Sequence, residues 1–244
     1  MAKRKASKNT AVLKLVPKVN LPNGDEETLS YIVSILNENA KLKTSFERLY
    51  QQTIHALMRC LEERDAYTYG HCMRVMEYGL MIGRAADLSD SQLKSLELTA
   101  MFHDIGKIGI PDCVLLKPGK LDKSEVESIK THSLKGFEIL SLIDELKPIA
   151  KGVRHHHERI DGMGYPDSLS GDQIPLISRI ILVADTFDAM TSTRPYRRGL
   201  PFEVAYDELS RYAGAQFDEK YVKIFLEEHQ KLSTPIRKTI KKAA

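Results

Sequence analysis

Histidine and carboxylate residues recur in this sequence inside apolar helical patterns, and both residue types are common metal ligands. The central pair is His103-Asp104, which follows an apolar run and precedes Gly106 and Lys107. Adjacent residues reach one metal ion only where a helix ends or deforms, and Gly106 supplies such an ending. A single His-Asp pair carries little weight, so the interpretation depends on the other ligand types in the chain.

Further histidines fall on inward-facing helical positions. On a helix read from residue 126 to residue 139, His132 shares the apolar face, and His156 lies three residues after Val153 with His157 beside it. Asp185 stands in a strongly apolar run, and a buried carboxylate is costly unless it is paired or bound to a metal. One inward histidine is usually a hydrogen-bonded core residue, whereas several from separate helices favour a multinuclear site inside a bundle. Imidazole with carboxylate suits iron, manganese, zinc or nickel.

The elements that position these residues are predicted to be helices throughout. Residues 25–69 contain no proline or glycine and carry an apolar stripe, which predicts one or two long helices. The stripe either packs on the core of its own chain or, because residues 37–43 are polar, forms an extension that pairs with another subunit. Ser89 and Asp122 are predicted helix caps, and Pro148 fits a first helical turn. Further helices are expected near residues 71–88, 93–104, 122–139, 148–156, 178–190, 201–212 and 218–225, with loops at 111–121 and 161–175.

Composition limits the classes of function. The 244 residues are 42% hydrophobic and 28% charged, as in a soluble globular protein, and the net charge of +3 comes from basic residues at both ends. We expect these ends to be solvated tails rather than nucleic-acid or membrane contacts. The three cysteines form no Cys-x-x-Cys pattern, which excludes a zinc knuckle. The longest apolar run, residues 180–184, is too short for a membrane span, so a cytoplasmic protein is expected.

Several sequence blocks occur together in the order of one known family. These are RDAYTYGH at 64–71, HDIGKIGIPD at 103–112, LKPGKL at 116–121, HHERIDGMGYP at 156–166 and VADTFDAMTSTRPYR at 183–197. The chain from residue 53 to residue 225 resembles the HD-GYP family of bacterial cyclic di-GMP phosphodiesterases, a branch of the HD-domain metal phosphohydrolases. The resemblance implies an all-α HD-domain bundle with a dinuclear metal site in its core. We expect a flexible basic tail (1–24), an N-terminal helical extension (25–52), the HD-GYP phosphodiesterase domain (53–230) and a basic tail (231–244).

The resemblance also implies the site residues. The metal ligands would be His71, His103, Asp104, His132, His156, His157 and Asp185. Asp104 would bridge two ions, iron or manganese, with His71, His103 and Asp185 on one side and the remaining histidines on the other. Tyr67 stands where some members carry a glutamate that holds a third metal, which argues against a third ion here. His155 lies outside the ligand pair of the family.

The implied reaction is hydrolysis of cyclic di-GMP to pGpG, with onward cleavage to GMP left open. Two metal ions can hold a bridging hydroxide as the nucleophile, so the catalytic residues would be Asp104 and Lys107. Substrate contacts are expected at Asp65, Lys107, Asp188, Arg194, Arg197 and Tyr165. The Gly164-Tyr165-Pro166 tip either shapes the substrate pocket or docks a partner, such as a diguanylate cyclase (GGDEF) domain.

Alternatives remain open at this point. The substrate could be another cyclic dinucleotide such as cyclic GMP-AMP, or the domain could bind a cyclic dinucleotide without cleaving it. About 50 residues precede the domain, too few for a receiver. We therefore expect regulation through a homodimer formed by the N-terminal helix or through a receiver or GGDEF partner in trans. The sequence does not identify the metal, the upstream signal or the final product.

Overall fold

The computed structural model describes residues 26–64, 68–193 and 198–240 of the chain. The expected tail at residues 1–24 lies outside these ranges, as do Asp65, Tyr67, Arg194 and Arg197. Contacts divide the chain into two units, Met1–Ile54 and His55–Ala244, which we call the N-terminal unit and the helical unit. Each unit is described by itself.

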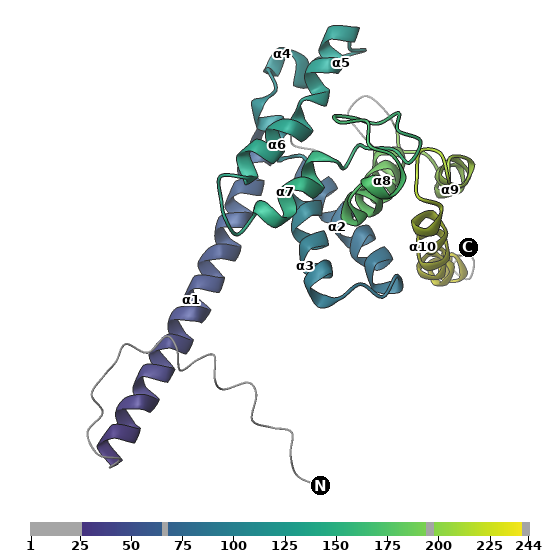
Figure 1. The fold of residues 1–244 in the computed structure, drawn as a ribbon. Helices are drawn as coiled ribbons and strands as arrows, with labels where there is room; N and C mark the ends of the chain where they lie inside the picture. The colour runs from purple at the N-terminus through teal and green to yellow at the C-terminus, as the bar shows by residue number, and fades with distance from the viewer. Residues whose placement is uncertain (1–25, 65–67, 194–197, 241–244) are drawn as a thin grey trace. The chain divides into compact units, whose positions relative to one another are not determined.

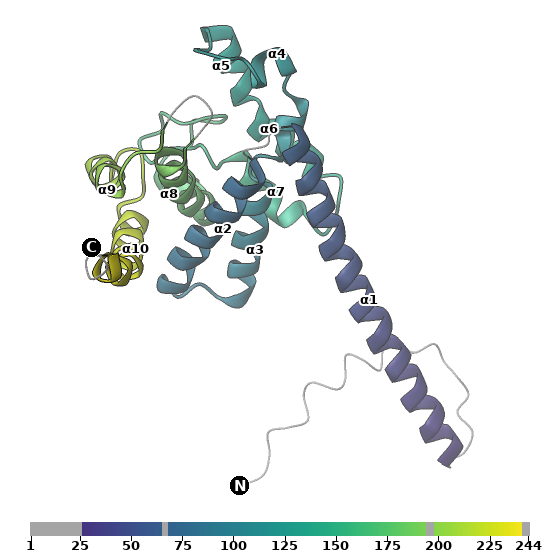
Figure 2. The same ribbon diagram turned by 180° about the vertical axis from the view of Figure 1, so that it is seen from behind.

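The described elements are helices, as Figures 1 and 2 show from opposite sides. An isolated bridge between Ala213 and Phe217 is the one β-type pairing in the described ranges. This confirms the predicted all-α class. The elements are α1 (Glu26–Arg64), α2 (Thr68–Ala85), α3 (Asp90–Phe102), η2 (Ile105–Gly109), α4 (Asp112–Leu115), α5 (Lys123–Lys130), α6 (His132–Leu140), α7 (Lys147–Arg154), η3 (Gly171–Gln173), α8 (Leu176–Thr191), α9 (Phe202–Arg211) and α10 (Glu219–Ile240).

The core of the helical unit lies between α2, α3, α8, α9 and α10. Helix α2 packs against α3 and α8, and α10 contacts α2, α8 and α9. On the other side, α7 packs on α3, and α6 packs on α7 and η2. Leu96 of α3, Ile180 of α8 and Phe225 of α10 are fully buried in the shared core. Burial of such apolar side chains is the main force that holds the ligand-bearing helices together.

Two glycines allow η2 to approach α6 closely. A Cβ atom on Gly106 would stand 1.9 Å from the carbonyl oxygen of His132 and 2.4 Å from the backbone nitrogen of Gly136. No side chain fits there, because the two backbones are in direct contact. Helix α3 ends at Phe102, so the predicted helix end next to His103-Asp104 is present. Gly106 is not among the residues with positive φ, so it does not end the helix through a left-handed conformation. Its role is to let the backbone next to Asp104 reach His132.

Local signals located most helix starts correctly. Ser89 and Asp122 form capping boxes with Gln92 and Glu125, and Pro148 lies in the first turn of α7, as predicted. None of the helices in the described ranges is long and apolar enough to cross a membrane.

Three helix boundaries differ from the sequence prediction. The single helix expected over residues 122–139 is two helices, α5 and α6, which meet at Thr131. The predicted loop at 111–121 contains the short helix α4. Helix α10 continues to Ile240, into the segment expected as a basic tail.

Candidate metal centre

The seven predicted metal ligands converge in the helical unit from five places in its fold. His71 comes from α2, His132 is the first residue of α6, and Asp185 lies on α8. His103 and Asp104 follow the end of α3 at Phe102, and His156 and His157 lie in the turn after α7. The ends of α3 and α7 therefore present pairs of adjacent ligands, which a continuous helix would point in different directions.

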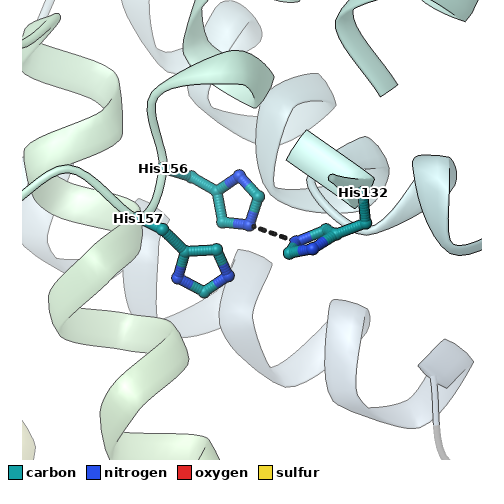
Figure 3. Close-up of side chains that lie close together, drawn as sticks. All are labelled: His132, His156 and His157. Carbon is teal, nitrogen blue, oxygen red and sulfur yellow. Dashed lines mark hydrogen bonds between the residues drawn. The ribbon is translucent and has the colours of Figure 1, made fainter. Parts of the chain in front are cut away.

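The ligand atoms form three overlapping groups, in each of which all the atoms lie within 4.8 Å of one another. One group contains His71, His103 and Asp185, and another contains His132, His156 and His157. Figure 3 shows the three imidazoles of the second group facing a common space. The third group, which joins the other two, contains His103, Asp104 and His156.

Asp104 lies between the two outer groups with one carboxylate oxygen turned toward each. Its Oδ2 is 3.4 Å from Nε2 of His103 and 3.8 Å from Nε2 of His71. Its Oδ1 is 3.4 Å from Nε2 of His132. A carboxylate so placed has the arrangement of a bridging ligand between two metal ions.

Main-chain carbonyl groups fix the tautomer of three histidines. Nδ1 of His103, His132 and His156 lies 2.6–2.7 Å from the carbonyl oxygen of the residue three positions earlier. A carbonyl oxygen only accepts, so Nδ1 carries a proton in all three rings, and in the neutral form of each ring Nε2 keeps its lone pair. In metal sites the other ring nitrogen of a ligating histidine is usually engaged in this way.

The free nitrogen atoms fit divalent metal ions better than they fit each other. Nε2 of His132 and Nε2 of His156 lie 3.2 Å apart although both keep a lone pair. The buried Nε2 of His103 has no hydrogen-bond partner among the described residues. Buried polar atoms normally have partners, so these atoms indicate a shared ligand such as a metal ion. Oxygen and imidazole donors of this kind suit first-row divalent metals.

The histidines of the two outer groups differ in their preferred protonation. Burial, with the charges of neighbouring histidines, lowers the pKa of His156 well below its usual value and that of His157 to about 3. Burial also lowers the pKa of His71, but hydrogen bonds to Asp185 and Asp188 outweigh it and leave the pKa raised. The group that contains His71 therefore holds protons more tightly in the absence of metal.

The acidic ligands are ionised. Burial acts to raise the pKa of Asp104, but the charges of Lys107 and His103 lower it well below its usual value. For Asp185 burial is likewise outweighed, by the hydrogen bond and charge of His71. Lys107 Nζ lies 2.8 Å from Oδ2 of Asp104 and is partly exposed. The ammonium group therefore stands at the edge of the cluster, in contact with Asp104.

Asp188 is buried against His71, and its expected role as a substrate contact stays a prediction. Its side chain is 1% exposed and lies behind His71, with Oδ2 2.7 Å from Nδ1 of that ring. Arg74 donates to both carboxylate oxygens of Asp188, from Nε to Oδ1 at 2.5 Å and from Nη2 to Oδ2 at 3.0 Å. The hydroxyl of Ser192 also donates to Oδ1, at 3.1 Å. These hydrogen bonds and charges outweigh burial and lower the pKa of Asp188 to about 2. Asp188 therefore orients the ring of His71, one of the predicted metal ligands.

Tyr165 faces the ligand cluster rather than the solvent. Its ring stacks on His157 with centroids 4.8 Å apart and an interplanar angle of 28°, and its edge approaches His132. Gly164, Tyr165 and Pro166 are all half-buried, whereas Met163 is 77% exposed. The expectation that the Gly164-Tyr165-Pro166 segment projects as an exposed tip is therefore wrong. Met163 occupies the tip.

Glu158 holds this loop in place, a role that the sequence analysis missed. Its carboxylate is 1% exposed and accepts hydrogen bonds from the backbone nitrogens of Asp167 at 2.7 Å and Leu169 at 3.0 Å. Only glycine fits at position 164, because a Cβ there would stand 2.4 Å from the backbone nitrogen of Arg159. The charged residue inside the HHE sequence was a signal that could have indicated such a buried anchor.

His155 points away from the cluster, in agreement with its exclusion from the ligand set. Its Nε2 lies 2.9 Å from Asp167, which also pairs with Arg154 at 2.7 Å.

Arg74 was also missed, although it follows His71 by three residues and so shares its face of α2. The four site residues outside the described ranges (Asp65, Tyr67, Arg194 and Arg197) remain predictions.

Comparisons with known proteins agree with this arrangement. A family model described as "HD domain" matches residues 55–221. The cyclic di-GMP phosphodiesterase response regulator RpfG of Xanthomonas campestris pv. campestris is 39% identical over 182 residues, which cover 74% of this chain and 48% of that protein. The 3'3'-cGAMP-specific phosphodiesterase 3 of Vibrio cholerae is 39% identical over 152 residues, with coverage of 62% and 33%.

The fold also matches solved structures. The HD domain of the phosphodiesterase PgpH of L. monocytogenes aligns with a TM-score of 0.55 at 16% identity, covering 75% of this chain and 99% of that domain. At this identity the likeness speaks for the fold alone. The chain spans about half the length of the first curated relative and a third of the other.

Proposed function

The chain belongs to the HD domain family, and on this basis we propose that it is a metal-dependent phosphodiesterase that hydrolyses cyclic di-GMP. The observation that carries the proposal is the position of Asp104 between two groups of converging ligand atoms. Two relatives named for this activity, at 39% and 38% identity, support the same substrate class. The expected product is pGpG, with GMP as the product of a second cleavage.

We propose two bound ions, iron or manganese, held by seven ligands: Asp104 between the ions and three further ligands on each side. Such ions activate water and neutralise charge on a phosphoryl oxygen. The chain itself supplies the orientation of the donors, through the carbonyl groups behind His103, His132 and His156. Burial lowers the pKa of His132 and His156, so Nε2 is free of a proton in these two rings and metal binding needs no tautomer change there.

Lys107 is proposed as a phosphate contact. Its ammonium group is partly exposed and lies 2.8 Å from Asp104, at the edge of the cluster. A bound phosphodiester would bring a non-bridging oxygen to the same place, where a point charge stabilises the extra negative charge of the transition state. Tyr165 covers the His157 side of the cluster and offers an aromatic face for the substrate.

A second candidate substrate is 3'3'-cyclic GMP-AMP. The specific observation in its favour is that a relative named for this substrate has the same 39% identity as one named for cyclic di-GMP. The two molecules share the phosphodiester ring and differ in one base, so the metal ligands do not separate them. A domain that only binds the dinucleotide is less favoured, because the sequence retains all seven residues of the predicted ligand set.

The test is hydrolysis by the full chain, loaded with Mn²⁺ or, without oxygen, with Fe²⁺, and with the bound metal quantified. Cyclic di-GMP and 3'3'-cyclic GMP-AMP are supplied separately, and the linear products are identified by chromatography. We expect pGpG from cyclic di-GMP and no product from Asp104→Asn at equal helicity. A fully metal-loaded chain that cleaves neither dinucleotide would refute the proposed function.

A further inference from the structure

Helix α1 presents a continuous apolar stripe in the N-terminal unit. Leu42, Phe46 and Leu49 are 62%, 62% and 61% exposed, and Ile32 is 36% exposed. No other element is described in this unit, so within the described residues of the unit nothing covers the stripe. Large apolar side chains in one row on a surface indicate a contact with another molecule.

The stripe has the seven-residue period of a coiled coil. Counting from Ile32, apolar or small residues alternate at spacings of three and four, which are the a and d positions of successive heptads. The a positions hold Ile32, Asn39, Phe46 and Thr53, and the d positions hold Ile35, Leu42 and Leu49. Three heptads of helix extend for roughly 30 Å at about 1.5 Å per residue. The spacing favours a left-handed pair of helices, because the a/d seam then stays on one side.

Asn39 is the one polar amide in this seam. An asparagine at an a position lowers stability, but it selects the alignment in which it meets an asparagine of the partner helix. In a parallel, in-register pair of identical helices, Asn39 meets Asn39 of the other copy. In a shifted register it would face an apolar side chain and leave its amide without a partner, which is costly.

The charges beside the seam favour the same arrangement. Glu38 occupies a g position, and Lys43 occupies the e position of the next heptad; both are exposed. In a parallel pair the g residue of one helix faces the following e residue of the other, so Glu38 meets Lys43 twice across the interface. An antiparallel pair instead brings g against g and e against e, which places like charges together.

We propose that α1 forms a parallel, two-stranded, in-register coiled coil with α1 of a second copy of this chain, with Asn39 setting the register. The occupant of the stripe is a second copy because the charge pattern and the asparagine are complementary to themselves. This inference does not depend on the proposed enzymatic activity, since none of the residues involved belongs to the candidate metal centre.

The first test is the mass of the full chain in solution, by sedimentation equilibrium. We expect twice the chain mass of 27.6 kDa, and the monomer mass for the double variant Leu42→Glu, Leu49→Glu. The matched control is Val33→Glu, an equally apolar-to-acidic change at a b position of the same helix, where Val33 is 54% exposed. A monomeric wild-type chain, a trimer or tetramer, or a control variant that dissociates like the double variant would overturn the proposal.

The second test is orientation and register, by disulfide trapping in a chain whose Cys60 and Cys113 are replaced by serine. Ile32→Cys and Thr53→Cys are made separately, at a positions at the two ends of the same seam, so that Asn39 is retained. In a parallel, in-register pair each cysteine meets its own copy, so both variants should form a linked dimer on oxidation. An antiparallel pair can place at most one of the two positions beside its own copy, so linkage of only one variant, or of neither, refutes the parallel arrangement. Lys41→Cys, which faces away from the seam, is the control and should stay unlinked.

Discussion

Replacing Asp188 by asparagine removes the charge behind His71 and leaves the shape of the side chain. Oδ2 of Asp188 accepts from Nδ1 of His71 at 2.7 Å, and both oxygens accept from Arg74. An asparagine keeps one acceptor oxygen, and Arg74 competes for it with the His71 ring. The expected result is an imidazole that is less well oriented and less basic as a metal ligand.

The magnitude follows from the position of Asp188 behind a ligand. Loss of such a partner lowers metal affinity by about 10- to 100-fold, which corresponds to about 1.4–2.7 kcal/mol. The loss should fall on one ion alone, because His71 belongs to the group with His103 and Asp185 and not to the group with His132, His156 and His157. The variant should therefore retain one tightly bound ion and release the other more readily.

The assay is competition with a chelator, with bound Mn²⁺ counted at each chelator concentration. The matched control is Asp144→Asn, the same chemical change at a side chain that is 85% exposed and pairs with Lys147. Circular dichroism checks that helicity is unchanged. Wild-type affinity for both ions in the Asp188→Asn chain would refute the orienting role, and an equal loss of both ions would refute the division into two groups.

Three further predictions concern the same centre. Lys107→Ala should keep or slightly strengthen metal binding, since it removes a cation 2.8 Å from Asp104, but it should lower kcat. The control is Lys120→Ala, at an exposed position. An unchanged kcat in the Lys107 variant would contradict the phosphate contact. Tyr165→Phe should preserve the stacking on His157 and the KM, whereas Tyr165→Ala should raise the KM; equal KM values for the two variants would show that the ring does not act through its face. On acidification, the group with His71 should lose its metal first, because the raised pKa of His71 lets protons compete from a higher pH. The group with His157, whose pKa is lowered to about 3, should keep its metal to a lower pH. Simultaneous release of both ions would contradict this order.

Part of the candidate ligand set was indicated by local signals in the sequence, whereas His71 was included only because of the family resemblance. His103 and Asp104 end an apolar helical run, and Asp185 interrupts another, so the polar residue stands out against its neighbours. The helix caps at Ser89 and Asp122 were also local, since a capping box needs only residues three positions apart. Such local features can be recognised without knowledge of the tertiary structure.

The details that the sequence did not reveal all depend on contacts between distant segments. The pairing of Asp188 with His71 and Arg74 joins residues that lie more than 110 positions apart, and no periodicity reports it. Glycine is a residue type that often ends helices, but at position 106 it is required because the backbone of α6 lies directly against it. The break at Thr131 was hidden because the apolar spacing continues on both sides of it.

The carbonyl groups behind three of the histidines affect how easily the centre is damaged by mutation. His103, His132 and His156 take their orientation from main-chain atoms three residues earlier, and no side-chain substitution removes a main-chain acceptor. His71 instead takes its orientation from the side chain of Asp188 on another helix. Side-chain substitutions that leave the backbone in place therefore preserve the orientation of these three rings. A single base change in the codon for Asp188 removes the group that orients His71. Mutations are therefore expected to affect the candidate ligands unequally, and a sensitive position, Asp188, is not itself one of the predicted metal ligands.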